Sequence, residues 1–123
     1  MLYLALFLSG GALYVALELF WRGRSHGSMF LAGGTALVLL TGVFSRLPQL
    51  PAIWLCALGA LLITAIEFIT GAVVNGRLGL NVWDYSDLPC NLYGQVCLRY
   101  SLLWALLCAP VTLLPPLIAA IRA

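Results

Sequence analysis

The sequence predicts an all-α, polytopic membrane protein in which four transmembrane helices form one domain over residues 1–123. Hydrophobic residues make up 63% of the chain and charged residues only 8%, and the mean hydropathy is +1.07. These values lie outside the range of soluble domains. Four hydrophobic stretches approach the roughly 20 residues that cross a hydrocarbon core about 30 Å thick. Because charges are so few, we expect no nucleic acid partner.

The first two spans are predicted at residues 2–21 and 29–44. Trp21 followed by Arg22 is typical of a membrane interface, and the polar turn 22–28 separates the two spans. The arginines follow the first hydrophobic run instead of preceding it. We therefore expect a retained span and not a cleaved secretory signal.

The third and fourth spans are predicted at residues 52–74 and 102–121. Proline removes a helical hydrogen bond, so the fourth span should be kinked by its three prolines, Pro110, Pro115 and Pro116. The polar loop 75–99 between these spans is too long for a simple turn. We expect it to be interfacial or re-entrant. The alternative is a plain surface loop with an aromatic anchor.

Glu67 is the stronger of two signals for a polar site inside the membrane. An acid within a span costs about 2.5 kcal/mol or more unless it faces protein or water. Thr64, Gly71 and Asn75 share a helix face with Glu67 by three- and four-residue spacing. We expect this stripe to face the bundle, so that Glu67 contacts protein or a water-filled cavity and not lipid.

Glu18 is the second acid within a span, and it lies close to the interface marked by Trp21. Arg22 follows it by four residues on the same helix face, in the orientation that favours an ion pair. We expect Glu18 to pair with Arg22, or with Arg24. A structural salt bridge would account for Glu18 fully.

The first and third spans end on one surface, side A, which carries the turn 22–28 and the loop 75–99. Both glutamates and four of the six arginines lie at or toward this surface. The excess of arginine predicts that loops 22–28 and 75–101 are cytoplasmic, and we expect the bacterial inner (plasma) membrane. A polar vestibule open on side A is predicted to contain Glu67, Glu18, Arg22, Asp84, Asn91 and Gln95.

The segment from Trp83 to Cys97 is expected to fold back onto the side A ends of the first and third spans and to cap the vestibule. Its polar side chains need hydrogen-bond partners, and its aromatic residues favour the headgroup level. Asp84 should then bind an arginine or backbone N–H groups near the helix ends.

Small residues are predicted to supply the helix packing. Gly10 and Gly11 in the first span and Gly33 and Gly34 in the second permit close approach of backbones. Four cysteines and the single histidine, His26, have no metal-ligand spacing, so we expect neither a metal nor another cofactor. No serine or cysteine has a recognisable activating partner, and the interpretation leans away from an enzyme.

The second half of the chain carries a specific motif. Its residues are Trp83, Asp84, Tyr85, Ser86, Pro89, Asn91, Gly94, Cys97 and Ser101, followed by Trp104. This string resembles the family labelled putative ABC-transporter type IV, or CmpB-like, which includes the transmembrane protein 229 proteins. The loop after the first span is shorter than in many relatives, and Cys90 stands where an aromatic residue is common. The chain has no GxxxxGK[ST] loop, so it is not expected to be an ATPase.

The resemblance implies transport. We expect a homo-oligomeric channel or small-solute transporter whose polar vestibule uses Glu67, Asp84, Arg22 and the Trp83 loop. The alternative is a non-transporting scaffold or lipid-binding module with Trp83, Tyr85 and Arg99 as an interfacial platform. The expected partners are membrane lipid and further copies of the chain, or a different membrane-protein subunit.

Overall fold

The computed structural model describes residues 1–122, and most of them are helical. Four helical stretches are long and apolar enough to cross a membrane, which confirms the predicted fold class. The elements are α1 (Leu2–Arg22), α2 (Gly27–Ser45), α3 (Ala52–Gly71), the π-helix η1 (Ala72–Arg77) that continues α3, β1 (Asn91–Leu92), β2 (Val96–Cys97), α4 (Leu98–Val111) and α5 (Leu114–Arg122).

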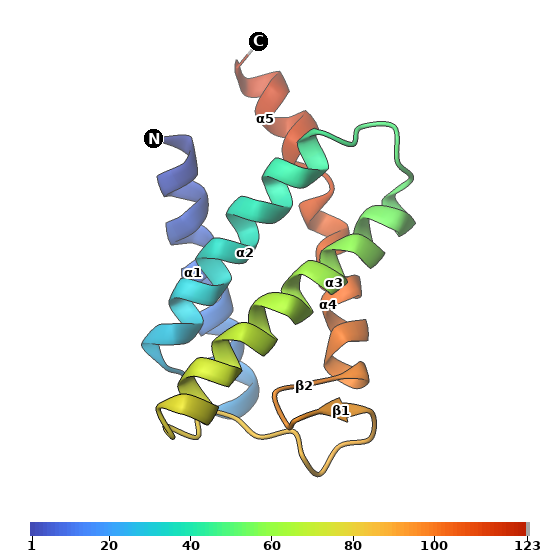
Figure 1. Ribbon diagram of the computed structural model, residues 1–123. Coiled ribbons are helices and arrows are strands. Elements are labelled where there is room, and N and C mark those ends of the chain that lie inside the picture. The colour runs from blue at the N-terminus through green and yellow to red at the C-terminus, as the bar shows by residue number, and fades with distance from the viewer. Residues whose placement is uncertain (123) are drawn as a thin grey trace.

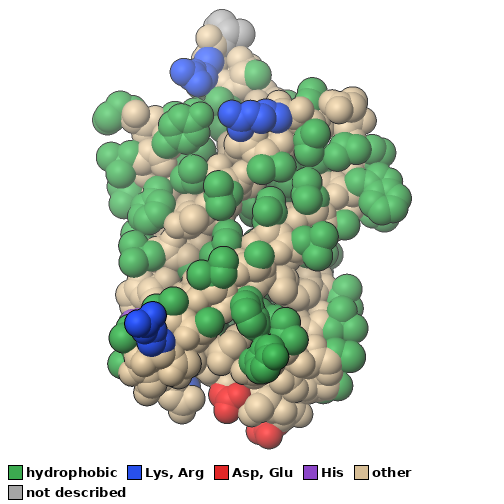
Figure 2. All heavy atoms as spheres, viewed as in Figure 1, with side chains coloured by type: hydrophobic (Ala, Val, Ile, Leu, Met, Phe, Trp, Pro, Cys, Tyr) green, Lys and Arg blue, Asp and Glu red, His purple; other side chains and the backbone are tan. Residues whose placement is uncertain are grey.

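The helices pack in two pairs, α1 along α2 and α3 along α4. The N-terminus and the end of α5 lie at one end of the molecule (Figure 1), and the α1–α2 turn and the small hairpin lie at the opposite end, which is side A. Figure 2 shows charged side chains near the two ends and hydrophobic side chains over much of the face between them. This distribution is the one expected when the ends meet water and the middle meets lipid.

Glycines set the close spacing between α1 and α2. A Cβ atom on Gly33 would lie 2.5 Å from the Cβ of Tyr14, and one on Gly10 would lie 2.6 Å from the carbonyl oxygen of Gly33. Real side chains do not tolerate such distances, so only glycine permits this approach. The prediction that small residues pack the first two spans is confirmed.

Two buried clusters hold the helices together. The larger one joins α2, α3 and α4, and includes Phe44, Leu55, Ile63 and Cys108. The smaller one lies toward side A and contains Tyr14, Met29 and Trp83. Because Trp83 belongs to this second cluster, the segment after η1 is part of the packed structure.

The α1–α2 turn has a defined geometry at both of its ends. Gly23 closes α1 with φ 73°, a left-handed conformation that glycine adopts without strain, and its N–H donates to the carbonyl of Leu19. His26 is the N-cap of α2, and its Nδ1 accepts a hydrogen bond from the backbone N–H of Ser28. The short segment between these caps is therefore held at side A.

The fourth span differs in detail from its prediction. It begins at Leu98 instead of residue 102, so Arg99 lies in the first turn of α4 and not in the loop. The first turn of a helix tolerates polar residues because its N–H groups already lack intrahelical partners. A break between α4 and α5 follows Pro110, and this confirms the predicted kink.

The segment 78–97 between η1 and α4 contains a short hairpin. β1 and β2 are antiparallel, with Asn91 opposite Cys97 and Leu92 opposite Val96. Tyr93 and Gly94 in the connecting turn have φ values of 54° and 72°. The hairpin leads directly into α4, because the N–H of Leu98 donates to the carbonyl of Cys90.

Candidate functional site

Glu67 is buried between helices, with only 2% of its surface exposed. The hydroxyl of Tyr14 on α1 donates a hydrogen bond of 2.7 Å to Glu67 Oε1 on α3. A buried carboxylate needs such a donor, because an unpaired one is costly away from water. The prediction that Glu67 faces protein and not lipid is confirmed.

Glu18 forms the expected ion pair with Arg22. Arg22 Nη1 lies 3.2 Å from Glu18 Oε2, and the four-residue spacing places both side chains on one face of α1. Arg22 Nη2 also donates to the carbonyl oxygen of Val82 at 2.6 Å. One guanidinium thus ties α1 to the segment after η1.

A single face of α1 brings these groups together. Tyr14, Glu18 and Arg22 follow one another at four-residue intervals, so they lie in one row along the helix. The row runs from the buried Tyr14–Glu67 hydrogen bond to the Arg22–Val82 hydrogen bond at side A. The row therefore carries two separate polar contacts, one inside the bundle and one at side A.

The polar stripe predicted on α3 faces α4 and the hairpin. The hydroxyls of Thr64 and Ser101 are 2.7 Å apart, and Asn75 Nδ2 donates to Gln95 Oε1 at 2.9 Å. A Cβ atom on Gly71 would meet the ring of Trp83 at 3.0 Å as well as the side chain of Gln95. The stripe is thus occupied by protein contacts along its length.

Trp83 anchors the segment 78–97 against the helices. Its side chain is 3% exposed, and its Nε1 donates to the carbonyl of Gln95 at 2.8 Å. The amide oxygen of Asn75 accepts a hydrogen bond from the N–H of Val82 at 2.6 Å. The segment thus folds back onto the side A ends of α1 and α3, as expected from the sequence.

Asp84 is placed differently from its prediction. Its side chain is exposed and accepts a hydrogen bond of 2.9 Å from the N–H of Ser86 in its own loop. Hydrogen bonds from the side chain and the backbone of Ser86 lower the pKa of Asp84. Asp84 therefore binds a backbone N–H, one of the two kinds of partner expected, but that N–H belongs to its own loop and not to a helix end, and no ion pair within residues 1–122 joins Asp84 to an arginine.

Asn91 and Gln95 stabilise the hairpin. Asn91 Nδ2 donates to the carbonyl of Leu88 at 2.8 Å, and its Oδ1 accepts from the N–H of Gly94 at 3.0 Å. Gln95 Nε2 donates to the carbonyl of Tyr93. These contacts position the loop that also contains Pro89, and they explain the polar residues of the motif without a ligand.

A pocket of about 250 Å³ lies between α1, α4 and Tyr85. Of the six residues predicted for the vestibule, Glu18 and Arg22 line it, Glu67 lies behind Tyr14, and Asp84, Asn91 and Gln95 do not line it. Its lining is Tyr14, Leu17, Glu18, Phe20, Trp21, Arg22, Tyr85, Tyr100, Leu103, Trp104 and Leu107.

Aromatic rings form much of this lining. Tyr85 stacks on Tyr100 with ring centroids 4.8 Å apart, and Tyr14 packs on Trp104 at 5.3 Å. Trp21 Nε1 donates to the hydroxyl of Tyr100 at 3.4 Å. Burial raises the pKa of Tyr85. The pocket therefore combines aromatic and aliphatic surfaces with one ion pair.

Sequence reasoning missed the role of Tyr14, Tyr100 and Trp104. Tyr14 precedes Glu18 by one helical turn, and this spacing could have placed it on the polar face of α1. The indole Nε1 of Trp104 is buried and has no hydrogen-bond partner within residues 1–122. No spacing rule connects α4 to α1, so Trp104 could be placed only by the tertiary structure.

The fold and its four apolar helices define an integral membrane protein. A family model described as "Putative ABC-transporter type IV" matches residues 12–121. The chain belongs to this family, and the resemblance carried by the motif from Trp83 to Trp104 is confirmed. Comparisons with curated proteins and with solved structures gave no match.

Proposed function

We propose that this protein is a membrane transport component that binds a small amphipathic solute in the pocket between α1, α4 and Tyr85, which we call the solute pocket. The observation that carries the proposal is the lining of that pocket, in which apolar and aromatic side chains surround the Glu18–Arg22 ion pair. Ligand sites are typically concave, mostly apolar and supplied with a few polar groups that fix orientation. Membership of a family named for transport supports the same conclusion.

The position of each side chain suggests how the solute is held. The aliphatic part would contact Leu17, Leu103 and Leu107, and its polar group would reach Glu18 or Arg22. Tyr14 separates the pocket from Glu67. Rotation of Tyr14 would expose the buried carboxylate, which makes Tyr14 a candidate gate between the pocket and the bundle interior.

We also propose that copies of the chain associate through the fourth span. Only 6% of the most apolar window in Leu98–Arg122 is buried, against 44% for α2. The fourth span therefore has most of its apolar surface free for lipid or for a second copy. Because the solute pocket lies within one chain, the geometry favours a small-solute transporter over a pore formed only between chains.

The test uses purified protein reconstituted in proteoliposomes. A panel of anionic, neutral and cationic amphipathic solutes is assayed for flux, and binding is followed through the fluorescence of Trp21 and Trp104, which line the pocket. Leu103→Trp should fill the pocket and reduce both signals at least tenfold. The matched control is Leu106→Trp, because Leu106 lies on the same helix, is 69% exposed and does not line the pocket.

Two results would contradict the proposal. One is folded wild-type protein that gives neither flux nor a fluorescence change across the panel. The other is an equal loss of signal in Leu103→Trp and Leu106→Trp, because that would show that the solute does not occupy this pocket. The first result would favour the non-transporting scaffold or lipid-binding alternative, and the second would place solute binding elsewhere in the molecule.

A further inference from the structure

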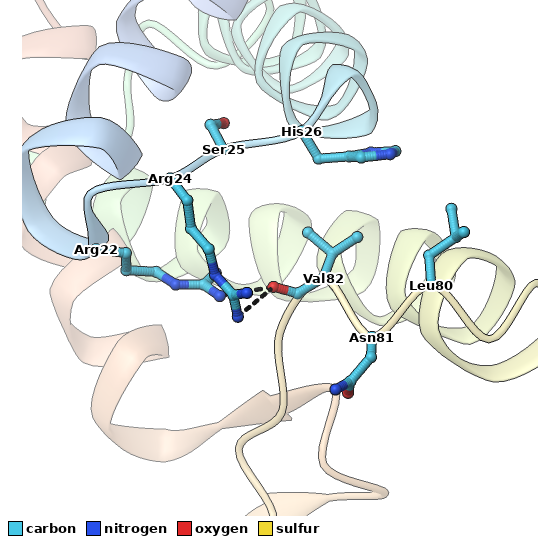
Figure 3. Close-up of a pocket in the computed structure, with 7 residues that line it drawn as sticks. All are labelled: Arg22, Arg24, Ser25, His26, Leu80, Asn81 and Val82. Atoms are coloured by element: carbon cyan, nitrogen blue, oxygen red, sulfur yellow. Dashed lines mark hydrogen bonds between the residues drawn. The ribbon is translucent and has the colours of Figure 1, made fainter.

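A second pocket, of about 160 Å³, lies at side A between the α1–α2 turn and the segment 80–82. Figure 3 shows Arg22 and Arg24 extending from the turn toward the carbonyl oxygen of Val82, with Leu80 and Asn81 on the opposite side. The residues that line this pocket are Arg22, Arg24, Ser25, His26, Leu80, Asn81 and Val82. It differs from the solute pocket, with which it shares only Arg22.

Two guanidinium groups converge on a single acceptor in this pocket. Arg22 Nη2 lies 2.6 Å and Arg24 Nη2 lies 3.5 Å from the carbonyl oxygen of Val82 (Figure 3). Like charges held this close repel each other unless an anion lies nearby. The carboxylate of Glu18 pairs with Arg22, whereas no ion pair within residues 1–122 involves Arg24. The cluster therefore carries an excess positive charge.

The side chains of this pocket offer more hydrogen-bond donors than the chain offers acceptors. A guanidinium has five N–H donors, and the one hydrogen bond from Arg24 within residues 1–122 is the long contact to Val82. Ser25 Oγ is buried and has no hydrogen-bond partner in the same part of the chain. Arg24 is exposed, so its other N–H groups are available to an anion from outside the chain, and Ser25 Oγ lacks the partner that buried polar atoms normally have.

The position of the pocket indicates the kind of anion. It lies at the side A end of α1, next to Trp21, a residue typical of the membrane interface, and α2 begins at Gly27 with the positive end of its dipole toward this turn. Its volume of about 160 Å³ is well above the roughly 10–15 Å³ that a single water needs, so the pocket has room for a group of several atoms such as phosphate. Arginine binds phosphate oxygens with two parallel N–H groups.

We propose that Arg22, Arg24 and Ser25 form a binding site for a phosphate-bearing anion at side A. Arg24 is the principal ligand because Arg22 is already bound to Glu18 and Val82. The phosphate belongs either to an anionic lipid headgroup or to a soluble phosphate compound. The proposal does not depend on the transport function, because its principal ligand, Arg24, does not line the solute pocket.

The experiment has two arms, both with the purified full-length protein in detergent. In one, native mass spectrometry measures retention of phosphatidic acid against phosphatidylcholine. In the other, calorimetric titration measures binding of inorganic phosphate. Retention of phosphatidic acid without phosphate binding identifies a lipid headgroup site, and binding of inorganic phosphate identifies a site for soluble phosphate compounds. Absence of binding in both arms overturns the proposal.

Variants assign the binding to this pocket. Arg24→Gln removes the unpaired cation, leaves the Glu18–Arg22 pair in place and should weaken binding about tenfold. Arg24→Lys should retain part of the affinity, and Ser25→Ala should reduce it less than Arg24→Gln does. Arg77→Gln is the matched control, because Arg77 is an exposed arginine on η1 at the same end of the molecule and does not line the pocket.

The binding measurements on these variants distinguish a specific site from a general attraction to basic residues. Folding is checked by tryptophan fluorescence and size-exclusion chromatography, and if Arg24→Gln fails this check, Ser25→Ala and Arg24→Lys carry the comparison. Weakening by the Arg24 and Ser25 variants with Arg77→Gln unchanged supports the site. Equal weakening by Arg77→Gln shows a diffuse attraction to basic residues and overturns the proposal.

Discussion

Individual side chains on α1 perform two different tasks. Tyr14 donates a hydrogen bond to the buried Glu67 and separates it from the solute pocket. Glu18 holds Arg22, and Arg22 in turn binds the carbonyl of Val82. In the loop after η1, Asp84 is exposed and accepts a hydrogen bond from the N–H of Ser86, so this acid stabilises a turn.

Replacement of Tyr14 by phenylalanine should destabilise the protein. Glu67 would lose the one hydrogen bond observed for its carboxylate within residues 1–122, at a cost of about 1–3 kcal/mol for a buried group left unpaired. Thermal unfolding in detergent measures the effect. Tyr3→Phe is the matched control, because it removes the same hydroxyl from an exposed position on the same helix. Equal stability of the two variants would show that the Tyr14–Glu67 hydrogen bond has no net effect.

Neighbouring helices pack closely at the positions of their smallest residues. α1 and α2 approach closely where Gly10 and Gly33 meet. The stripe of Thr64, Gly71 and Asn75, which runs from α3 into η1, contacts α4 and the segment 78–97. Without a hydrophobic driving force between helices in lipid, this close packing and these hydrogen bonds supply the association.

A methyl group at the α1–α2 contact tests this packing. Gly33→Ala should destabilise the protein by about 1–3 kcal/mol, because the added Cβ would lie 2.5 Å from the Cβ of Tyr14 and the helices would have to separate. Gly42→Ala on the same helix is the control. The nearest atom to its added Cβ is Arg46 Nη1 at 3.6 Å, so alanine should stabilise the helix by up to about 1 kcal/mol. Denaturation in detergent distinguishes the two, and a stable Gly33→Ala variant would contradict the close contact.

The whole molecule is polarised along its long axis. Side A carries the α1–α2 turn, the hairpin and both pockets that contain arginine, whereas the opposite end carries the N-terminus and the end of α5 (Figure 1). Four of the six arginines belong to side A, and the positive-inside bias predicts that side A is cytoplasmic.

Labelling of Cys90 tests this orientation. Cys90 is an exposed free cysteine in the side A loop, whereas Cys97 and Cys108 are buried. A membrane-impermeant maleimide should label inverted vesicles strongly and right-side-out vesicles weakly, and Cys90→Ser should abolish the difference. Stronger labelling of right-side-out vesicles would reverse the orientation, and equal labelling of both would indicate that the chain inserts in both directions.

The sequence by itself determined the four spans, the kinked fourth span, the burial of Glu67 and the Glu18–Arg22 pair. These features depend on hydropathy, proline and the helical period, all of which act over short distances along the chain. The motif from Trp83 to Trp104 was also sufficient to indicate the family, because its string of residue types is specific.

Only the tertiary structure decided which residues meet across helices. The partner of Glu67 is Tyr14, 53 residues away, and Trp83 is buried in a cluster with Tyr14 and Met29. Asp84 is exposed and accepts a hydrogen bond from the N–H of Ser86 in its own loop. Contacts between distant segments depend on distances in space, which local sequence patterns do not encode, so the solute pocket and the pocket lined by Arg22 and Arg24 became visible only once the chain was folded.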